Sequence, residues 1–179
     1  MESQTTELRT PLPDVTLPDV DGVEHDLREV AGDHPLLVVF ACNHCPYVRW
    51  LEHDLGRLIT QSGIRAVAIN SNDVREYPED GPAGMREQRA RAGWDFPYLI
   101  DTDQTVATAF GAVCTPDFFL YDAAGLLAYR GAFDASSPKN GQPRTGDLLS
   151  AAIADVQAGR PVPEPHRPAM GCGIKWKQS

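Results

Sequence analysis

The chain has 179 residues, of which 42% are hydrophobic and 23% charged, a composition typical of a globular protein and unlike that of a disordered chain. Its 16 Lys and Arg residues face 25 Asp and Glu residues, and the basic residues form no cluster that could neutralise a row of phosphates. No apolar run is long enough to cross a bilayer, and residues 1–7 are polar and acidic, unlike a secretory signal. We therefore expect no nucleic-acid partner, no membrane association and a cytoplasmic location.

The length fits one compact domain with short extensions. Residues 1–13 contain two prolines and no hydrophobic period, which indicates a surface arm. We expect the domain itself to cover residues 14–160. Residues 161–179 begin with closely spaced prolines and form a second, stiff arm that carries Cys172.

The first half of the chain alternates between strand and helix patterns. An Asp-Gly turn within residues 17–27 predicts an N-terminal β-hairpin. The continuous apolar run 36–41 predicts a strand buried on both faces, and helical spacing over residues 47–63 predicts a helix that ends at a glycine. A turn that contains two cysteines therefore joins a buried strand to a helix.

The second half continues this alternation and adds an antiparallel edge. The expected elements are a strand at 64–70, a loop at 71–84, a charged helix at 85–92, a strand at 96–101, a short helix at 105–110, a hairpin at 118–129 and a last helix at 147–158. Together these elements predict an α/β fold with a central mixed β-sheet flanked by helices.

The chain has four cysteines, and two of them lie in the turn at residues 42–46. Pro46 suits the first position of a helix, which places Cys45 at the N-cap. There the unpaired backbone N–H groups and the positive end of the helix dipole favour a thiolate. Two cysteines at this spacing between a strand and a helix are typical of a redox site, so Cys45 and Cys42 are candidate catalytic residues.

Two other interpretations of the turn stay open. The cysteines could be small buried hydrophobic residues without chemistry. Alternatively, Cys42, His44 and Cys45 are ligand types for copper or zinc, and Cys172 could complete a set of four. No second paired motif supports a metal, so we expect no metal and no cofactor and keep metal binding as an alternative.

Three separated motifs, together with the tail at residues 171–177, carry a family resemblance. They are the strand with Phe40 that leads into the cysteine turn, residues 110–116 before a strand, and the hairpin turn at 122–125. The pattern resembles the thioredoxin superfamily, in particular a peroxiredoxin-like (AhpC/TSA-type) branch of bacterial thioredoxin-domain proteins. The resemblance implies a thioredoxin-like fold with an N-terminal β-hairpin extension.

The resemblance also implies a site and an activity. Pro116 would be a cis proline packed against the active-site sulfurs, and Thr115, Pro116 and Pro46 would line a substrate groove. The Thr115 backbone would then be available to an extended, thiol-bearing substrate. The implied activity is thiol-disulfide exchange with substrate proteins, with a cellular thiol as reductant, and a homodimer stays open.

A comparison with the family pattern leaves the exact activity open. Peroxiredoxins place Thr or Ser three residues before the peroxidatic cysteine, whereas Cys42 stands at that position here. Thioredoxins place their second cysteine at the position of Val48. A thiol-dependent peroxidase with an antioxidant role therefore stays an alternative to the thiol-disulfide oxidoreductase.

The partner of Cys45 is open for the same reason. Cys42 is one candidate, and Cys172 is a second resolving thiol if the C-terminal arm swings back. Ile174 and Trp176 favour docking of this arm, because apolar residues have no role in a mobile tail. We expect Cys114 to be a buried packing thiol.

Overall fold

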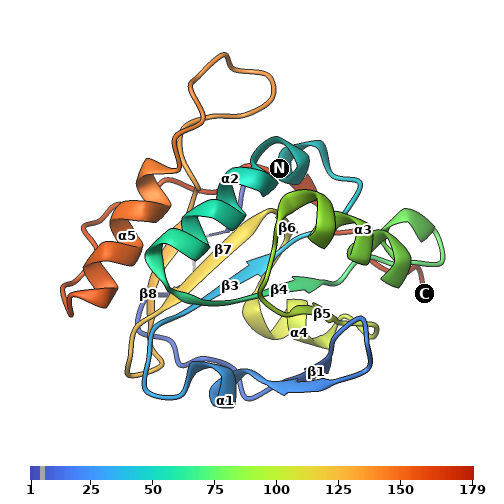
Figure 1. The fold of residues 1–179 in the computed structure, drawn as a ribbon, viewed down its shortest axis with the longest axis horizontal. Helices are drawn as coiled ribbons and strands as arrows, with labels where there is room; N and C mark the ends of the chain where they lie inside the picture. Colours follow the sequence, from blue (N-terminus) through green and yellow to red (C-terminus); the bar gives the residue numbers. More distant parts are fainter. Residues whose placement is uncertain (5–6) are drawn as a thin grey trace.

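A five-stranded mixed sheet forms the centre of the computed structural model, which describes residues 1–4 and 7–179 (Figure 1). Its strands, in spatial order, are β5 (Tyr98–Ile100), β4 (Arg65–Asn70), β3 (Leu36–Phe40), β7 (Asp117–Tyr121) and β8 (Leu127–Gly131). The pairs β3–β4 and β4–β5 are parallel, whereas β7 is antiparallel to both β3 and β8. The predicted mixed sheet is therefore confirmed.

Helices cover both faces of the sheet, which explains why every residue of β3 is apolar and buried. Leu37 and Val39 pack on one side with the helices α2 (Pro46–Ser62), α3 (Pro82–Ala92) and α5 (Asp147–Gln157). Leu36, Val38 and Phe40 pack on the other side with α1 (Leu27–Ala31) and α4 (Thr105–Phe110). Figure 1 shows these two helical layers around the central strands.

The local predictions agree with the structure except at a few short elements. The N-terminal hairpin is present as β1 (Thr16–Pro18) and β2 (Glu24–Asp26). The sequence did not indicate α1, because five residues are too few to show a helical period. The prediction of a loop at 71–84 was wrong in its second half. There a 3-10 turn, η1 (Pro78–Asp80), precedes α3, which begins at Pro82.

Both terminal arms pack against the domain. In the N-terminal arm, Leu12 is buried and its N–H donates to Gly125 O, and Glu2 forms a β-bridge with Met170 of the C-terminal arm. Thr5 and Thr6, which belong to the predicted N-terminal arm, lie outside the described residues. The division into one domain and two arms stays a prediction.

The C-terminal arm adds a strand that the sequence did not predict. Strand β9 (Cys172–Gly173) pairs antiparallel with β6 (Cys114–Thr115), and Cys172 lies opposite Thr115. The sequence could not reveal this pairing, because the strands are two residues long and far apart in the chain. The arm is therefore docked, and Ile174 is buried as expected, whereas Trp176 is exposed.

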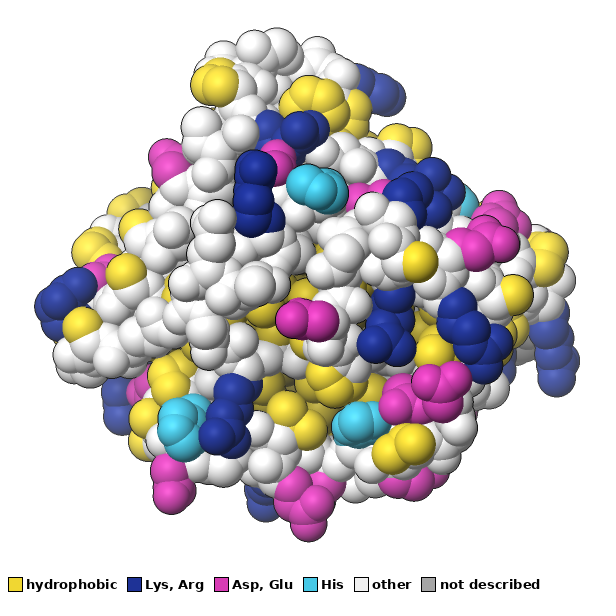
Figure 2. Space-filling model, viewed as in Figure 1, with side chains coloured by type: hydrophobic (Ala, Val, Ile, Leu, Met, Phe, Trp, Pro, Cys, Tyr) yellow, Lys and Arg dark blue, Asp and Glu magenta, His cyan; other side chains and the backbone are white. Residues whose placement is uncertain are grey.

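Neither sign of charge is concentrated on the face of the molecule that Figure 2 shows. Figure 2 shows basic and acidic side chains interspersed on this face of the molecule. No helix among residues 1–4 and 7–179 is long and apolar enough to span a membrane.

A buried ion pair fixes the segment around β6 and the start of β7. Arg130 Nη2 on β8 lies 2.8 Å from Asp117 Oδ2 and donates to Gly111 O at 2.9 Å. Both side chains are almost fully buried, and burial raises the pKa of Asp117 even with Arg130 beside it. The guanidinium also lies 4.4 Å from the centre of the Phe119 ring.

Replacing Arg130 by methionine should therefore destabilise the fold. The substitution leaves Asp117 buried without its counter-ion, and we expect the free energy of unfolding to fall by about 3 to 5 kcal/mol. Urea titration followed by circular dichroism measures this loss. The control is Arg160→Met, which removes an exposed pair with Asp155 and should cost less than about 1 kcal/mol. Equal losses of unfolding free energy in the two variants would contradict the role of the buried Arg130–Asp117 ion pair.

Candidate active site

The candidate site begins where the central strand β3 passes into α2. Cys45 is the N-cap of α2 and Pro46 is its first residue, as the sequence predicted. The helix ends at Gly63, whose φ of 69° favours glycine. This arrangement places Cys45 against the positive end of a long helix.

The structure brings three of the four cysteine sulfurs together. Cys45 is fully buried, Cys42 is 1% exposed and Cys172 is partly exposed. Cys42, Cys45 and Cys172 pack in one cluster, and both Cys42 and Cys172 lower the pKa of the Cys45 thiol. Cys114 is buried as expected, and its Sγ lies 3.8 Å from Pro116 O. Cys45 is therefore the central sulfur, and both proposed partners lie beside it.

Thr115 contacts the two buried sulfurs. Its hydroxyl lies 3.5 Å from Cys42 Sγ, and its carbonyl oxygen lies 3.2 Å from Cys45 Sγ, whose thiol form donates to it. The Thr115–Pro116 peptide bond is cis, which confirms the expectation from the family resemblance.

The hydrogen bond from Cys42 lowers the pKa of Cys45 to about 5, against the opposing effect of burial, and bonds from Cys172 and Thr115 add to the lowering. The same bond, burial and the charge of Asp80 raise the pKa of Cys42 far above its usual range. Burial and the bond to Cys45 raise the pKa of Cys172 to about 11. At neutral pH Cys45 is thus the thiolate, and its two neighbours are thiols that stabilise it.

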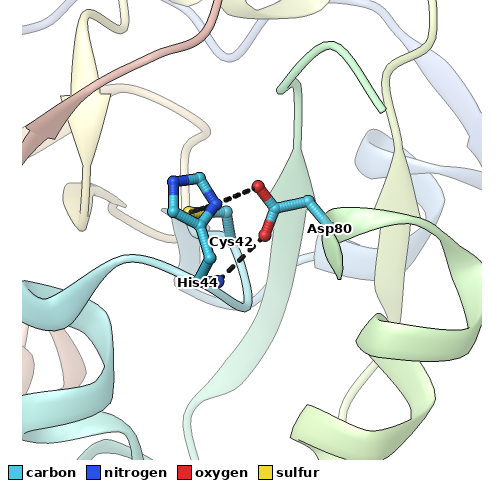
Figure 3. Close-up of side chains that lie close together, drawn as sticks. All are labelled: Cys42, His44 and Asp80. Atoms are coloured by element: carbon cyan, nitrogen blue, oxygen red, sulfur yellow. Dashed lines mark hydrogen bonds and ion pairs between the residues drawn. The ribbon is translucent and has the colours of Figure 1, made fainter. Parts of the chain in front are cut away.

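A buried carboxylate, Asp80, organises the cysteine turn (Figure 3). Its Oδ1 accepts the backbone N–H groups of Asn43 at 2.8 Å and His44 at 2.9 Å. Its Oδ2 accepts from Asn72 Nδ2 at 3.0 Å and pairs with His44 Nδ1. The bonds to Asn43 and His44 hold the turn that carries Cys42 and Cys45, and the bond from Asn72 holds the carboxylate in place.

Asp80 was not among the site residues expected from the sequence. It lies among several acids in a stretch expected to be a loop, and only its burial in η1 distinguishes it from its exposed neighbour Glu79. His44, which the sequence offered as a metal ligand, stacks on Tyr77 with ring centres 5.2 Å apart. Its second ring nitrogen points away from the carboxylate (Figure 3).

The same turn contains a set of potential metal ligands. Cys42 Sγ, His44 Nδ1 and an Asp80 oxygen all lie within 4.8 Å of one another. This set replaces Cys45 of the sequence-based metal hypothesis with Asp80. A metal ion there would have to displace the hydrogen bond between His44 and Asp80.

The expected substrate groove is partly filled by the chain itself. Pro116 lines a cavity of about 450 Å³ together with Tyr47 and Phe133, and Pro46 is exposed at the first turn of α2. Thr115, however, already pairs with Cys172 through its backbone. The expectation that this backbone is available to a substrate is therefore wrong for this conformation, because β9 occupies it.

Comparison with known proteins identifies the family of this chain and several relatives. The sequence profile of the AhpC/TSA family matches residues 8–130. The chain belongs to the AhpC/TSA family. An uncharacterized conserved protein from Geobacillus kaustophilus is 43% identical, with a TM-score of 0.96 over 100% of this chain and 97% of that one.

Two relatives bear the name of a redox activity. The thiol-disulfide oxidoreductase ResA from Geobacillus thermodenitrificans is 26% identical over 117 residues, which are 64% of this chain and 63% of that protein. A thiol:disulfide interchange protein of the thioredoxin family from Chlorobium tepidum is 18% identical, with a TM-score of 0.64 over 86% of this chain and 99% of that one. The second likeness confirms the thioredoxin-like fold.

The hydrogen bond from Cys42 should control the ionisation of Cys45. We expect thiolate absorbance near 240 nm to titrate at pH about 5 in the unmodified protein. Cys42→Ala removes the donor and should raise this pKa by about one unit or more, whereas Cys42→Ser keeps a donor and should raise it less. Identical titrations of the two variants would show that this hydrogen bond does not set the pKa.

The ionisation of Cys45 also links stability to pH. Because its folded pKa lies below the unfolded value of about 8.5, its contribution to stability is complete above that pH. The contribution is lost as the pH falls toward about 5. Urea titrations at several pH values should therefore show a larger loss of stability over this range for the unmodified protein than for Cys45→Ser.

Asp80→Asn should loosen the cysteine turn. The amide nitrogen would face N–H donors wherever it stands, so we expect the free energy of unfolding to fall by about 1 to 3 kcal/mol. Glu79→Gln changes an exposed neighbour and should stay within about 0.5 kcal/mol of the unmodified protein. Chemical denaturation of both variants provides the measurement, and an unchanged Asp80→Asn would refute the role of the carboxylate.

Proposed function

We propose that the protein is a thiol-disulfide oxidoreductase in which Cys45 is the attacking sulfur and Cys42 or Cys172 is the resolving thiol. The observation that carries this proposal is a buried cysteine at a helix N-cap with Cys42 and Cys172 packed beside it, an environment that lowers its pKa to about 5. Family membership and the names of the ResA and Chlorobium tepidum relatives support the same reaction class.

The reaction proceeds by two exchanges. Cys45 attacks one sulfur of a disulfide and forms a mixed disulfide, and the other sulfur leaves as a thiolate. Cys42 or Cys172 then loses its proton and attacks Cys45 Sγ, which releases the second thiolate and closes an internal disulfide. Two electrons have passed from the protein to the substrate, and two equivalents of a cellular thiol return the protein to its reduced state.

A reducing compartment such as the cytoplasm would supply this thiol, and we propose that location. The substrates are thiols or disulfides. Cys114 has no part in the cycle, because its sulfur is buried against Pro116 O.

Disulfide mapping tests the proposal. After equilibration in glutathione buffers of graded potential, the unmodified protein should form one internal disulfide that includes Cys45. Cys45→Ser should abolish it and slow the turnover of bis(2-hydroxyethyl) disulfide by about a hundredfold or more. Cys114→Ser is the matched control and should keep both properties. Full activity in Cys45→Ser would refute the proposal.

Membership of the AhpC/TSA family also favours a test of peroxidase activity. In that reaction Cys45 would become a sulfenic acid, and a second cysteine would condense with it and release water. Stopped-flow mixing with hydrogen peroxide decides between the activities. Oxidation of Cys45 no faster than that of a free thiol would exclude the peroxidase.

The ligand set at the turn supports a separate test of metal binding. Cys42, His44 and Asp80 lie close together, and Cys45 directly follows His44 in the chain. Anaerobic titration with Zn²⁺ and with Cu⁺ measures the affinity and stoichiometry of metal binding. The titration is carried out on the unmodified protein and on His44→Ala. Stoichiometric binding that His44→Ala weakens would favour the metal hypothesis.

A further inference from the structure

The C-terminal tail occupies the backbone edge beside the central sulfur. β9 pairs with β6, so that Cys172 lies opposite Thr115, and Ile174 N donates to Val113 O at 3.0 Å. A strand edge can pair with only one extended chain at a time. An extended protein substrate therefore cannot pair with Thr115 while β9 is present.

The tail fits this place closely. A Cβ atom on Gly171 would lie 2.1 Å from Thr115 O, so only glycine allows this approach. Ile174 is 5% exposed and packs with the core. The carbonyl oxygen of Lys175 accepts from Asp73 N at 2.8 Å and from Gln104 Nε2 at 2.9 Å. These contacts on both sides of Cys172 fix the backbone that carries its sulfur.

Of these three cysteines, Cys172 alone is partly exposed. Cys42 and Cys45 are buried, and Cys172 packs against the same cluster. A reagent in solution therefore reaches Cys172 before Cys45. Met170, two residues before Cys172 in the chain, lines the cavity of about 450 Å³ beside Tyr47 and Pro116, which has room for a molecule of tripeptide size.

We propose that a low-molecular-weight thiol, and not an extended protein strand, reduces the oxidised protein, and that it attacks at Cys172 Sγ. This inference rests on the proposed function and deepens it, because it names the chemical class of the reductant and the sulfur that carries the mixed disulfide with it.

The small thiol reduces the protein disulfide in two successive exchanges. A small thiolate attacks Cys172 Sγ of a Cys45–Cys172 disulfide; a new sulfur–sulfur bond forms to the small thiol, and Cys45 leaves as a thiolate. A second small thiolate attacks its partner in the mixed disulfide and releases the symmetrical small disulfide. Cys172 leaves with the electron pair and takes a proton from water. Two small thiols are oxidised, and the protein disulfide is reduced.

The acidity of the sulfurs favours this direction of attack. A thiol of low pKa is the better leaving group, and Cys45, with a pKa of about 5, is far more acidic than Cys172. Attack at Cys172 expels the stable thiolate, whereas attack at Cys45 would expel the basic one.

The first experiment locates the mixed disulfide. Oxidised full-length Cys42→Ser, in which Cys45 pairs with Cys172, is mixed with glutathione and quenched with acid at early times. Trypsin separates the two cysteines, and mass spectrometry then reports the glutathione. We expect at least about ten times more glutathione on Cys172 than on Cys45. A majority on Cys45 would overturn the inference.

The second experiment uses a matched pair of tail variants. Gly171→Ala clashes with Thr115 O and should displace the tail, whereas Gly173→Ala meets only the flexible end of Met1, 3.3 Å away. We expect a bulky maleimide to label Cys45 about ten times faster in Gly171→Ala than in the unmodified protein, and Gly173→Ala to stay within about twofold. Equal labelling in both variants would overturn the shielding role of the tail.

The two proposals fail in different ways. If the unmodified protein forms no internal disulfide at any potential, the proposed function fails and this inference falls with it. If the disulfide forms but glutathione attaches to Cys45, or reduced thioredoxin reduces the protein as fast as glutathione does, only the inference fails.

Discussion

Thr115 is the residue on which the arrangement of the sulfurs depends. Its hydroxyl contacts Cys42, its carbonyl oxygen contacts Cys45, and its backbone pairs with Cys172. The neighbouring ion pair of Arg130 with Asp117 fixes the chain on the other side of Pro116. One short segment, anchored to the sheet, thus contacts the two cysteines of the turn and the distant Cys172.

Two charges of the site explain why the two cysteines of the turn differ. Cys45 lies at the positive end of α2 and accepts hydrogen bonds from neighbouring thiols, which together outweigh the cost of burial. Cys42 is the donor in this network and lies near the carboxylate of Asp80, so its own ionisation is opposed. Ionising both thiols would place two negative charges side by side, so Cys42 keeps its proton when Cys45 is a thiolate.

The docked tail determines which sulfur is accessible in this thioredoxin-like fold. Its backbone fills the edge beside Cys45, while its own sulfur occupies the exposed place next to the reactive one. The protein therefore carries an internal chain where an extended partner would otherwise bind. The fit of Gly171 and Ile174 indicates that this docking is encoded in the tail itself.

Much of the fold could be predicted because local patterns encode it. The apolar run of β3 and the helical period of α2 are properties of consecutive residues, and their burial requires the layered α/β arrangement. The failures were short elements such as α1 and η1, which contain too few residues to show a period. The strand β9 escaped prediction because two residues carry no alternation that could mark a strand.

The sequence by itself determined that Cys45 lies at a helix N-cap, because Pro46 and the preceding apolar strand are adjacent to it in the chain. Only the tertiary structure decided which groups surround that sulfur. Asp80 and Cys172 approach the turn across long stretches of chain, and hydrogen bonding and burial at such distances depend on the packed sheet and not on neighbouring residues.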